Sequence, residues 1–245
     1  MVHTSRSPDA DEDRSFGIIV PYDFALDREI WRWVPDDVTL LLTRTHHLRL
    51  EATVEMAQHV STEETVRSAT DDLLAVEPAV VVYLCTSGSF VNGVVGEHRI
   101  RKVMLETGAP TAVTTSGALT HALSQLEIAK VTVVTPYVES VTDRLRSYLH
   151  ESGVEVMSSG GLGLVSRIWR VPYSRLFDFA LETDHPESEA VFIACTNLPT
   201  YDVIAPLEAA LGKPVLSANQ VSLWAALQAT GTPAAPTDQS LFGLL

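Results

Sequence analysis

An internal repeat constrains the fold of this 245-residue chain more than any other feature of its sequence. Three landmarks recur in the same order, with the members of each pair roughly 110 residues apart. They are a Pro-Tyr pair (Pro21-Tyr22 and Pro136-Tyr137), a Cys-Thr pair (Cys85-Thr86 and Cys195-Thr196), and a glycine before a short apolar run (Gly108 and Gly212). The only two cysteines of the chain both fall on this repeat. The recurrence therefore predicts a duplicated structural unit.

Short apolar runs alternate with amphipathic segments in both halves, which predicts an α/β fold. A capping box at Ser61 and Glu64 predicts the start of one helix, and residues 162–171 read as a loop. We expect strands over 16–22, 38–42, 79–84, 110–115, 131–135, 154–157, 190–194 and 214–217. We expect further helices over 94–107, 118–126, 138–152, 173–183, 203–211 and 221–230.

The repeat and the alternation together predict two pseudo-symmetric lobes, each a parallel sheet flanked by helices. We expect a disordered lead over 1–15, a first lobe over 16–118 and a second lobe over 119–218. A helix over 219–230 is expected to pack back on the first lobe. A tail over 231–245 ends in an apolar tip that docks on this chain or on a partner subunit. Because ligands bind beyond the carboxyl ends of parallel strands, the predicted active site lies in the cleft between the lobes.

The composition excludes several classes of partner. A formal net charge of −14 argues against nucleic acid and anionic membrane surfaces as partners. The chain has no apolar run of about 18 residues and no secretory signal at its start, so we expect a cytoplasmic protein without a membrane span. Two cysteines without a secretory signal indicate free thiols.

Each cysteine is expected at a strand end where the next helix starts, a position that favours the thiolate. The hydroxyls of Thr86, Ser87 and Thr196, with local N–H groups, can hold a carboxylate without a cation. Two small buried hydrophobic residues are the alternative interpretation of the thiols. His46 and His47 lack companion ligands at metal-site spacing, so no metal site is predicted.

The segments VYLCTSGSFVNG (82–93), VVTPY (133–137) and FIACTNLPTYDVIAPLEAALGKPVLSANQ (192–220) resemble the aspartate/glutamate racemase superfamily. The resemblance spans roughly residues 16–230 and is strongest to the branch of maleate cis–trans isomerases and arylmalonate decarboxylases. It implies two α/β lobes, no metal or organic cofactor, and often a homodimer. It also implies a small carboxylate substrate, contacted by Thr86, Ser87 and Tyr137.

The same resemblance implies catalysis by a cysteine from each lobe, here Cys85 and Cys195. We expect a cis–trans isomerase of a small unsaturated dicarboxylate, of the maleate-to-fumarate type. In this reaction Cys85 adds to the double bond and Cys195 is the acid/base partner. Tyr22, Thr196 and Asn197 are further candidates for substrate contacts.

Three alternatives stay open: a two-cysteine racemase of an amino acid or hydantoin, an arylmalonate-type decarboxylase, and a non-catalytic carboxylate-binding protein. The decarboxylases carry glycine at the first cysteine position, which leans against that reaction here. Maleate isomerases carry a substrate-binding asparagine just after the first strand, where this chain has Phe24 at the nearest position. They carry another before the second cysteine, and no asparagine lies between residues 137 and 195. Maleate itself is therefore in doubt as the substrate.

Overall fold

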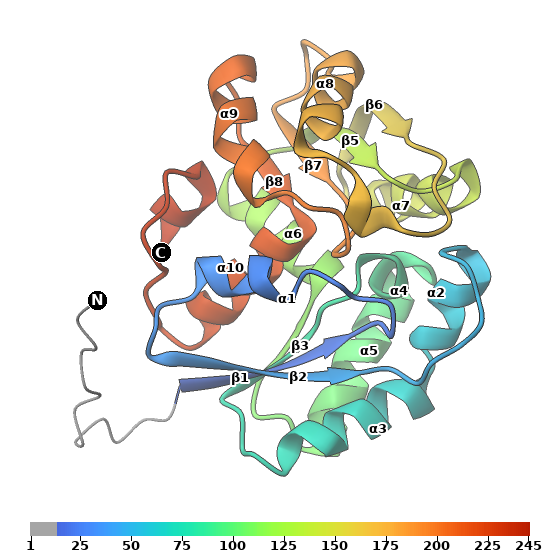
Figure 1. The fold of residues 1–245 in the computed structure, drawn as a ribbon, viewed down its shortest axis with the longest axis vertical. Coiled ribbons are helices and arrows are strands. Elements are labelled where there is room, and N and C mark those ends of the chain that lie inside the picture. Colours follow the sequence, from blue (N-terminus) through green and yellow to red (C-terminus); the bar gives the residue numbers. More distant parts are fainter. Residues whose placement is uncertain (1–13) are drawn as a thin grey trace.

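The computed structural model describes residues 14–245, which form two parallel sheets of the same topology (Figure 1). The first sheet has the order β2-β1-β3-β4 and the second the order β6-β5-β7-β8, and all neighbouring strands are parallel. The strands are β1 (Arg14–Val20), β2 (Val38–Arg44), β3 (Val80–Tyr83), β4 (Ala112–Thr114), β5 (Lys130–Thr135), β6 (Glu155–Gly161), β7 (Ala190–Ile193) and β8 (Val215–Ser217). The predicted fold class is confirmed.

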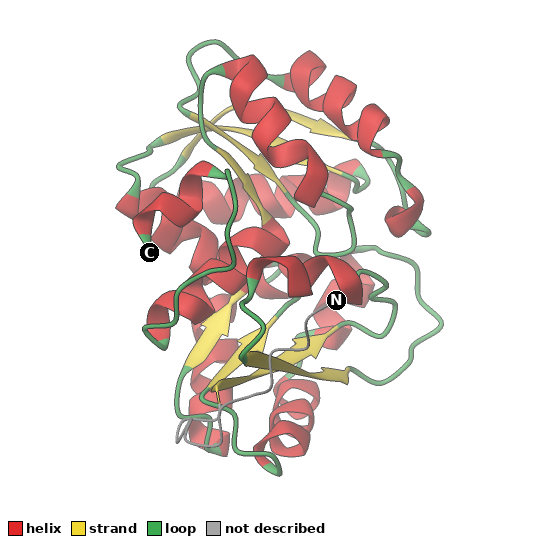
Figure 2. Cartoon of the chain, turned by 60° about the vertical axis from the view of Figure 1, so that its left-hand side comes forward, coloured by secondary structure: helices red, strands yellow, loops and turns green. Residues whose placement is uncertain are grey.

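Helices flank both sheets (Figure 2). They are α1 (Asp27–Ile30), α2 (Val54–Val60), α3 (Glu63–Leu74), α4 (Thr86–Phe90), α5 (Gly93–Thr107), α6 (Thr115–Gln125), α7 (Glu139–Glu151), α8 (Tyr173–Thr183), α9 (Tyr201–Leu211) and α10 (Ala218–Ala229), with short 3-10 turns η1 (Trp31–Trp33), η2 (Ile168–Arg170) and η3 (Ser240–Leu244). Helix α10 packs against α6 and touches β3, β4 and β8, so it contacts strands of both sheets. Each residue from Ala218 to Leu227 is buried, as expected for a helix that is enclosed on all sides.

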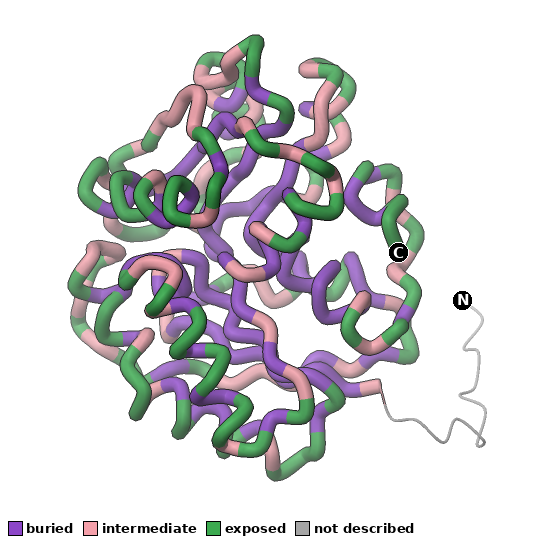
Figure 3. The backbone as a smooth tube through the Cα atoms, turned by 180° about the vertical axis from the view of Figure 1, so that it is seen from behind, coloured by how far each residue is buried: buried purple, intermediate pink, exposed green. Residues whose placement is uncertain are grey.

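The core is continuous between the lobes. One cluster of buried apolar residues runs from Phe16 in β1 to Leu216 in β8, and the outer helices carry the exposed positions (Figure 3). A second cluster lies between the first sheet and α3 and α5. Within residues 14–245 no helix is long and apolar enough to cross a membrane.

Several expected boundaries were wrong. Arg14 and Ser15, expected in the lead segment, belong to β1. The other residues of that predicted lead, 1–13, lie outside the described residues. Helix α3 is capped by Thr62, whose hydroxyl accepts a hydrogen bond from the Thr65 N–H, and not by Ser61. The short elements α1, α2 and α4 were not predicted. The division of the chain into lobes at residue 118 stays a prediction.

Strand β6 continues to Gly161, four residues beyond the expected end. A Cβ atom on Gly161 would lie 2.7 Å from the Tyr137 carbonyl oxygen, so glycine allows the strand to pass this close to the neighbouring backbone. The following segment, expected to be a loop, contains η2 and a hydrogen bond from the Ala52 N–H to the Val165 carbonyl at 2.8 Å. This segment of the second half therefore touches the first half.

The tip of the C-terminal tail docks on its own chain. Leu241 is fully buried and Phe242 is 8% exposed. Trp33 is also fully buried, whereas Trp31 is exposed. The homodimer stays a prediction.

Candidate active site between the lobes

The predicted site residues follow the ends of the central strands of the two sheets. Pro21, Tyr22 and Asp23 follow β1, and Cys85 comes two residues after β3. In the second sheet Tyr137 comes two residues after β5, and Cys195 two residues after β7. The two groups lie close enough for charges of the first half, on Cys85 and Asp23, to raise the pKa of Cys195 in the second half, and the Cys85 charge also raises the pKa of Tyr137. The structure therefore brings the two cysteines to one place at the junction of the lobes.

Cys85 lies at the N-terminal cap of α4 and is 3% exposed. Its Sγ is 3.9 Å from the Ser87 Oγ. Burial raises the pKa of this thiol to about 11, although the Gly88 N–H and the Ser87 hydroxyl act in the opposite direction. The expectation that a helix start would favour the thiolate is thus outweighed by desolvation.

Gly88 leaves space for the Tyr83 hydroxyl and the Cys85 sulfur, which both lie against its Cα. A Cβ atom at this position would lie 2.3 Å from the Tyr83 hydroxyl oxygen and 3.2 Å from the Cys85 Sγ. The Tyr83 hydroxyl itself donates a hydrogen bond to the Val60 carbonyl at 2.9 Å. The glycine in the sequence TSGSF is therefore explained by close packing behind the thiol.

Cys195 has a strained backbone, with φ of 86°. The expected helix does not follow it: the chain makes a turn in which the Leu198 N–H donates to the Cys195 carbonyl at 3.1 Å, and α9 begins only at Tyr201. The side chain is 7% exposed, and burial raises its pKa to about 12. The Tyr137 hydroxyl and the Asn197 N–H lower that pKa, so both lie beside the sulfur.

Tyr137 and Thr86 supply hydroxyls next to the two thiols. Tyr137 is 3% exposed, and its pKa is raised well above the ordinary value by burial and then by the charges of Cys195 and Cys85. The Thr86 Oγ1 is buried and has no hydrogen-bond partner among the described residues. A buried hydroxyl without a partner is costly, and a substrate carboxylate is a suitable acceptor for it.

Three other candidates have partners within the protein. The Tyr22 hydroxyl donates to the Leu50 carbonyl at 2.7 Å. The Thr196 carbonyl accepts from the Asn219 Nδ2 at 2.9 Å. The Asn197 side-chain amide joins the two halves of the chain by hydrogen bonds. Its Nδ2 donates to the Asp23 carbonyl at 3.0 Å, and its Oδ1 accepts from the Ala25 N–H at 2.9 Å. These contacts position the residues that surround the thiols.

Sequence reasoning missed Asp23. Its charge raises the pKa of Cys85, Cys195 and Tyr22. It directly follows Pro21-Tyr22, so the strand-end rule that selected Tyr22 could also have selected its neighbour.

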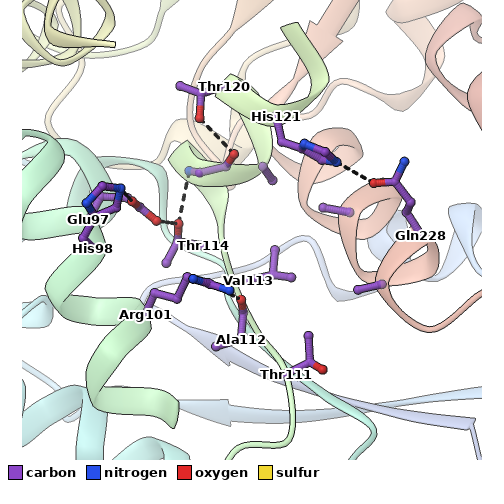
Figure 4. A pocket seen from close by; sticks show the side chains of 14 residues that line it. Glu97, His98, Arg101, Thr111, Ala112, Val113, Thr114, Thr120, His121 and Gln228 are labelled. Carbon is purple, nitrogen blue, oxygen red and sulfur yellow. Dashed lines mark hydrogen bonds and ion pairs between the residues drawn. The ribbon is translucent and has the colours of Figure 1, made fainter. Parts of the chain in front are cut away.

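A separate hollow of about 490 Å³ opens between α5, β4, α6 and α10 and contains none of the predicted site residues (Figure 4). The buried Glu97 carboxylate lies there, where it accepts a hydrogen bond from the Thr114 hydroxyl and pairs with the exposed His98. No group of three or more His, Cys, Asp or Glu residues within 14–245 has the arrangement of a metal site.

Comparison with known proteins gives a consistent set of relatives. The family model for arylmalonate decarboxylase matches residues 43–242. The chain is 29% identical over 157 residues to arylmalonate decarboxylase from Bordetella bronchiseptica, covering 62% of this chain and 65% of that protein. It is 27% identical over 166 residues to maleate isomerase from Nocardia farcinica, covering 64% and 66%. The matched regions thus span just under two thirds of both relatives.

The solved structures cover more of the chain. A liganded arylmalonate decarboxylase, in which a glycine is changed to cysteine and a cysteine to serine, superposes with a TM-score of 0.86 and 27% identity, covering 94% of this chain and 99% of that one. The Nocardia farcinica maleate cis–trans isomerase with a covalently bound succinylcysteine intermediate has a TM-score of 0.81 at 20% identity, covering 90% and 94%. The latter likeness supports the fold alone.

Proposed function

Because the chain belongs to the arylmalonate decarboxylase family, we propose that it is a cofactor-independent enzyme that isomerises a small unsaturated carboxylate from cis to trans. The observation that supports the proposal is that Cys85 and Cys195, one from each half of the chain, both lie close enough to Tyr137 for their charges to raise its pKa. A thiol on each side suits the addition of a nucleophile and a proton across a double bond. Relatives named maleate isomerase support the same reaction.

In the proposed reaction Cys85, whose raised pKa makes the thiol the resting form, first loses its proton to water. The resulting thiolate forms an S–C bond while the C=C π bond breaks. The electron pair moves onto the adjoining carboxylate as an enediolate, which the hydroxyls of Thr86 and Tyr137 stabilise. Cys195 donates its proton to the neighbouring carbon, and the former double bond rotates as a single bond. Cys195 then takes back the proton, the S–C bond breaks and the double bond re-forms as the trans isomer.

Decarboxylation of an arylmalonate is the second candidate, because the family model and the Bordetella bronchiseptica relative carry that name. The two reactions differ in what they require of the thiols. Decarboxylation needs a single proton donor, whereas the proposed isomerisation needs both a nucleophile and an acid/base group. Cys85 is therefore the residue that separates the two.

Proton NMR of the purified protein with maleate in deuterium oxide tests the proposal, beside Cys85→Ala and Cys195→Ala. Fumarate formed by the wild type and by neither variant is the expected result. Loss of carbon dioxide from phenylmalonate that depends on Cys195 and survives Cys85→Ala would instead establish the decarboxylase. Exchange of an α-proton on amino acids or hydantoins that needs both thiols would establish a racemase.

A further inference from the structure

Asp23 places a carboxyl group at the end of β1, next to the strand that leads to Cys85, and in contact with Asn197 of the second half. It is partly buried, it directly follows the Pro21-Tyr22 end of β1, and its Oδ2 lies 3.5 Å from the Nδ2 of Asn197, two residues beyond Cys195. Its backbone carbonyl accepts a second hydrogen bond from the same amide at 3.0 Å. The residue is therefore fixed between the halves of the chain, at the position where the sulfurs of Cys85 and Cys195 both sense its charge.

Arg44, the cation that acts on Asp23, is largely engaged elsewhere. The Arg44 Nη1 donates to the Phe24 carbonyl at 2.6 Å, and its Nη2 lies 3.3 Å from both oxygens of Asp27. Arg44 lowers the pKa of Asp23 only as the smallest of several influences, and burial, the largest of them, raises it. A ligand group that approaches Asp23 thus meets an acidic side chain without a dedicated counter-ion.

The site consequently offers two different polar environments. The unpartnered Thr86 hydroxyl and Tyr137 suit a carboxylate, whereas Asp23 repels a second carboxylate and accepts hydrogen bonds from an N–H or O–H group. Building on the proposed function, we propose that Asp23 makes this enzyme selective for a cis-alkene that carries a carboxylate at one end and a neutral hydrogen-bond donor, such as a primary amide, at the other. A symmetric dicarboxylate such as maleate is the poorer substrate.

Maleamate, the half-amide of maleate, is the probe. Its cis–trans conversion and that of maleate are followed by NMR in the wild type, in Asp23→Asn and in the control Asp36→Asn, which changes an exposed carboxylate of the first half and leaves the contacts of Arg44 intact. The wild type and the control are expected to prefer maleamate in kcat/KM, and Asp23→Asn to shift the ratio toward maleate by about tenfold or more, since each 1.4 kcal/mol of repulsion corresponds to about tenfold. A wild-type preference for maleate, or a ratio unchanged in Asp23→Asn, would overturn the inference and leave the proposed isomerase intact.

A binding measurement separates this inference from the proposed function. Thermal stabilisation by succinamate and by succinate, which have no double bond, is compared in the same three proteins. A preference for succinamate that is lost in Asp23→Asn supports the inference even when no isomerisation occurs, in which case the proposed function alone fails. A preference that is absent from the wild type or persists in Asp23→Asn refutes it, whatever the catalytic result.

Discussion

At the scale of the residue, Cys195 combines a reactive side chain with an unfavourable backbone. Its φ of 86° lies in the region that favours glycine, which costs other residues about 1–2 kcal/mol. We expect Cys195→Gly to be more stable to urea than Cys195→Ala by about 1 kcal/mol, because glycine removes the strain. Both variants lack the thiol, so both are expected to be inactive.

The same pair of substitutions at Cys85 is the matched control. Cys85 has φ of −146°, which any residue adopts. Here glycine is expected to be less stable than alanine by about 0.5–1 kcal/mol, because it loses more backbone entropy on folding. Equal effects of glycine at the two positions would show that the Cys195 backbone is not strained.

The buried thiols also predict a pH dependence of stability. Burial raises the pKa from 9.0 to about 11 for Cys85 and to about 12 for Cys195. Between the unfolded and folded pKa values the unfolded chain has lost these protons and the folded chain has kept them. The stabilisation is therefore fully present below about pH 9 and is lost as the pH rises, by about 1.4 kcal/mol per pH unit for each thiol.

Urea unfolding between about pH 8 and about pH 11 measures this effect. Because tyrosines also titrate there, the informative quantity is the difference in slope between the wild type and Cys85→Ala or Cys195→Ala. Each variant is expected to lose stability less steeply with rising pH than the wild type. Parallel curves would mean that the thiols are not desolvated as the structure indicates.

At the scale of the element, the N-terminal cap of α3 is Thr62 in the structure, whereas the sequence pattern predicted Ser61. The Thr62 hydroxyl accepts from the Thr65 N–H at 3.3 Å, whereas the Ser61 hydroxyl donates to the Gln58 carbonyl at 3.1 Å, behind the helix. We expect Thr62→Ala to lower the free energy of unfolding by about 1 kcal/mol and Ser61→Ala by clearly less. Chemical denaturation measures the free energy of unfolding of both variants. A larger loss in Ser61→Ala than in Thr62→Ala would show that Ser61 is the cap.

Prediction from sequence succeeded for elements whose patterns are determined locally. The buried runs in β1, β3, β5 and β7 are continuous and β-branched, as parallel central strands require. It failed where long-range contacts decide the structure. Strand β6 ends in the sequence SSGG, which carries no strand signal, and it is held by pairing with β5.

The candidate site shows the same division. The repeat predicted Cys85, Cys195 and Tyr137 as candidate site residues, because these residues recur at expected strand ends, and their roles stay a prediction. The role of Asn197 could not be predicted, since its partners Asp23 and Ala25 lie more than 170 residues earlier in the chain. The charge of Asp23, a first-half residue, also contributes to the raised pKa of Cys195 in the second half.

At the scale of the whole molecule, polar contacts fix the two halves to each other around the site. The buried Glu29 of α1 accepts from the Thr200 N–H at 3.0 Å and from the Thr200 hydroxyl at 3.0 Å, and Asn219 Nδ2 lies 3.5 Å away. The same Asn219 amide binds the Thr196 carbonyl, next to Cys195. The segment that carries Asp23 is therefore linked through α1 to the loop that carries the second thiol.

The C-terminal tail adds the last of these contacts, and Gln239 is its centre. The Gln239 Oε1 accepts from the Trp33 Nε1 at 2.8 Å and from the Gln220 Nε2 at 2.9 Å, and its Nε2 donates to the Tyr201 carbonyl at 3.2 Å. Gln239→Ala would leave two buried donors without an acceptor, so we expect a loss of about 2–4 kcal/mol in the free energy of unfolding. Ser240→Ala, at the exposed neighbouring position, is expected to cost clearly less, and urea denaturation compares the two. Equal small losses would mean that the tail does not stabilise the junction between α10 and the first half of the chain.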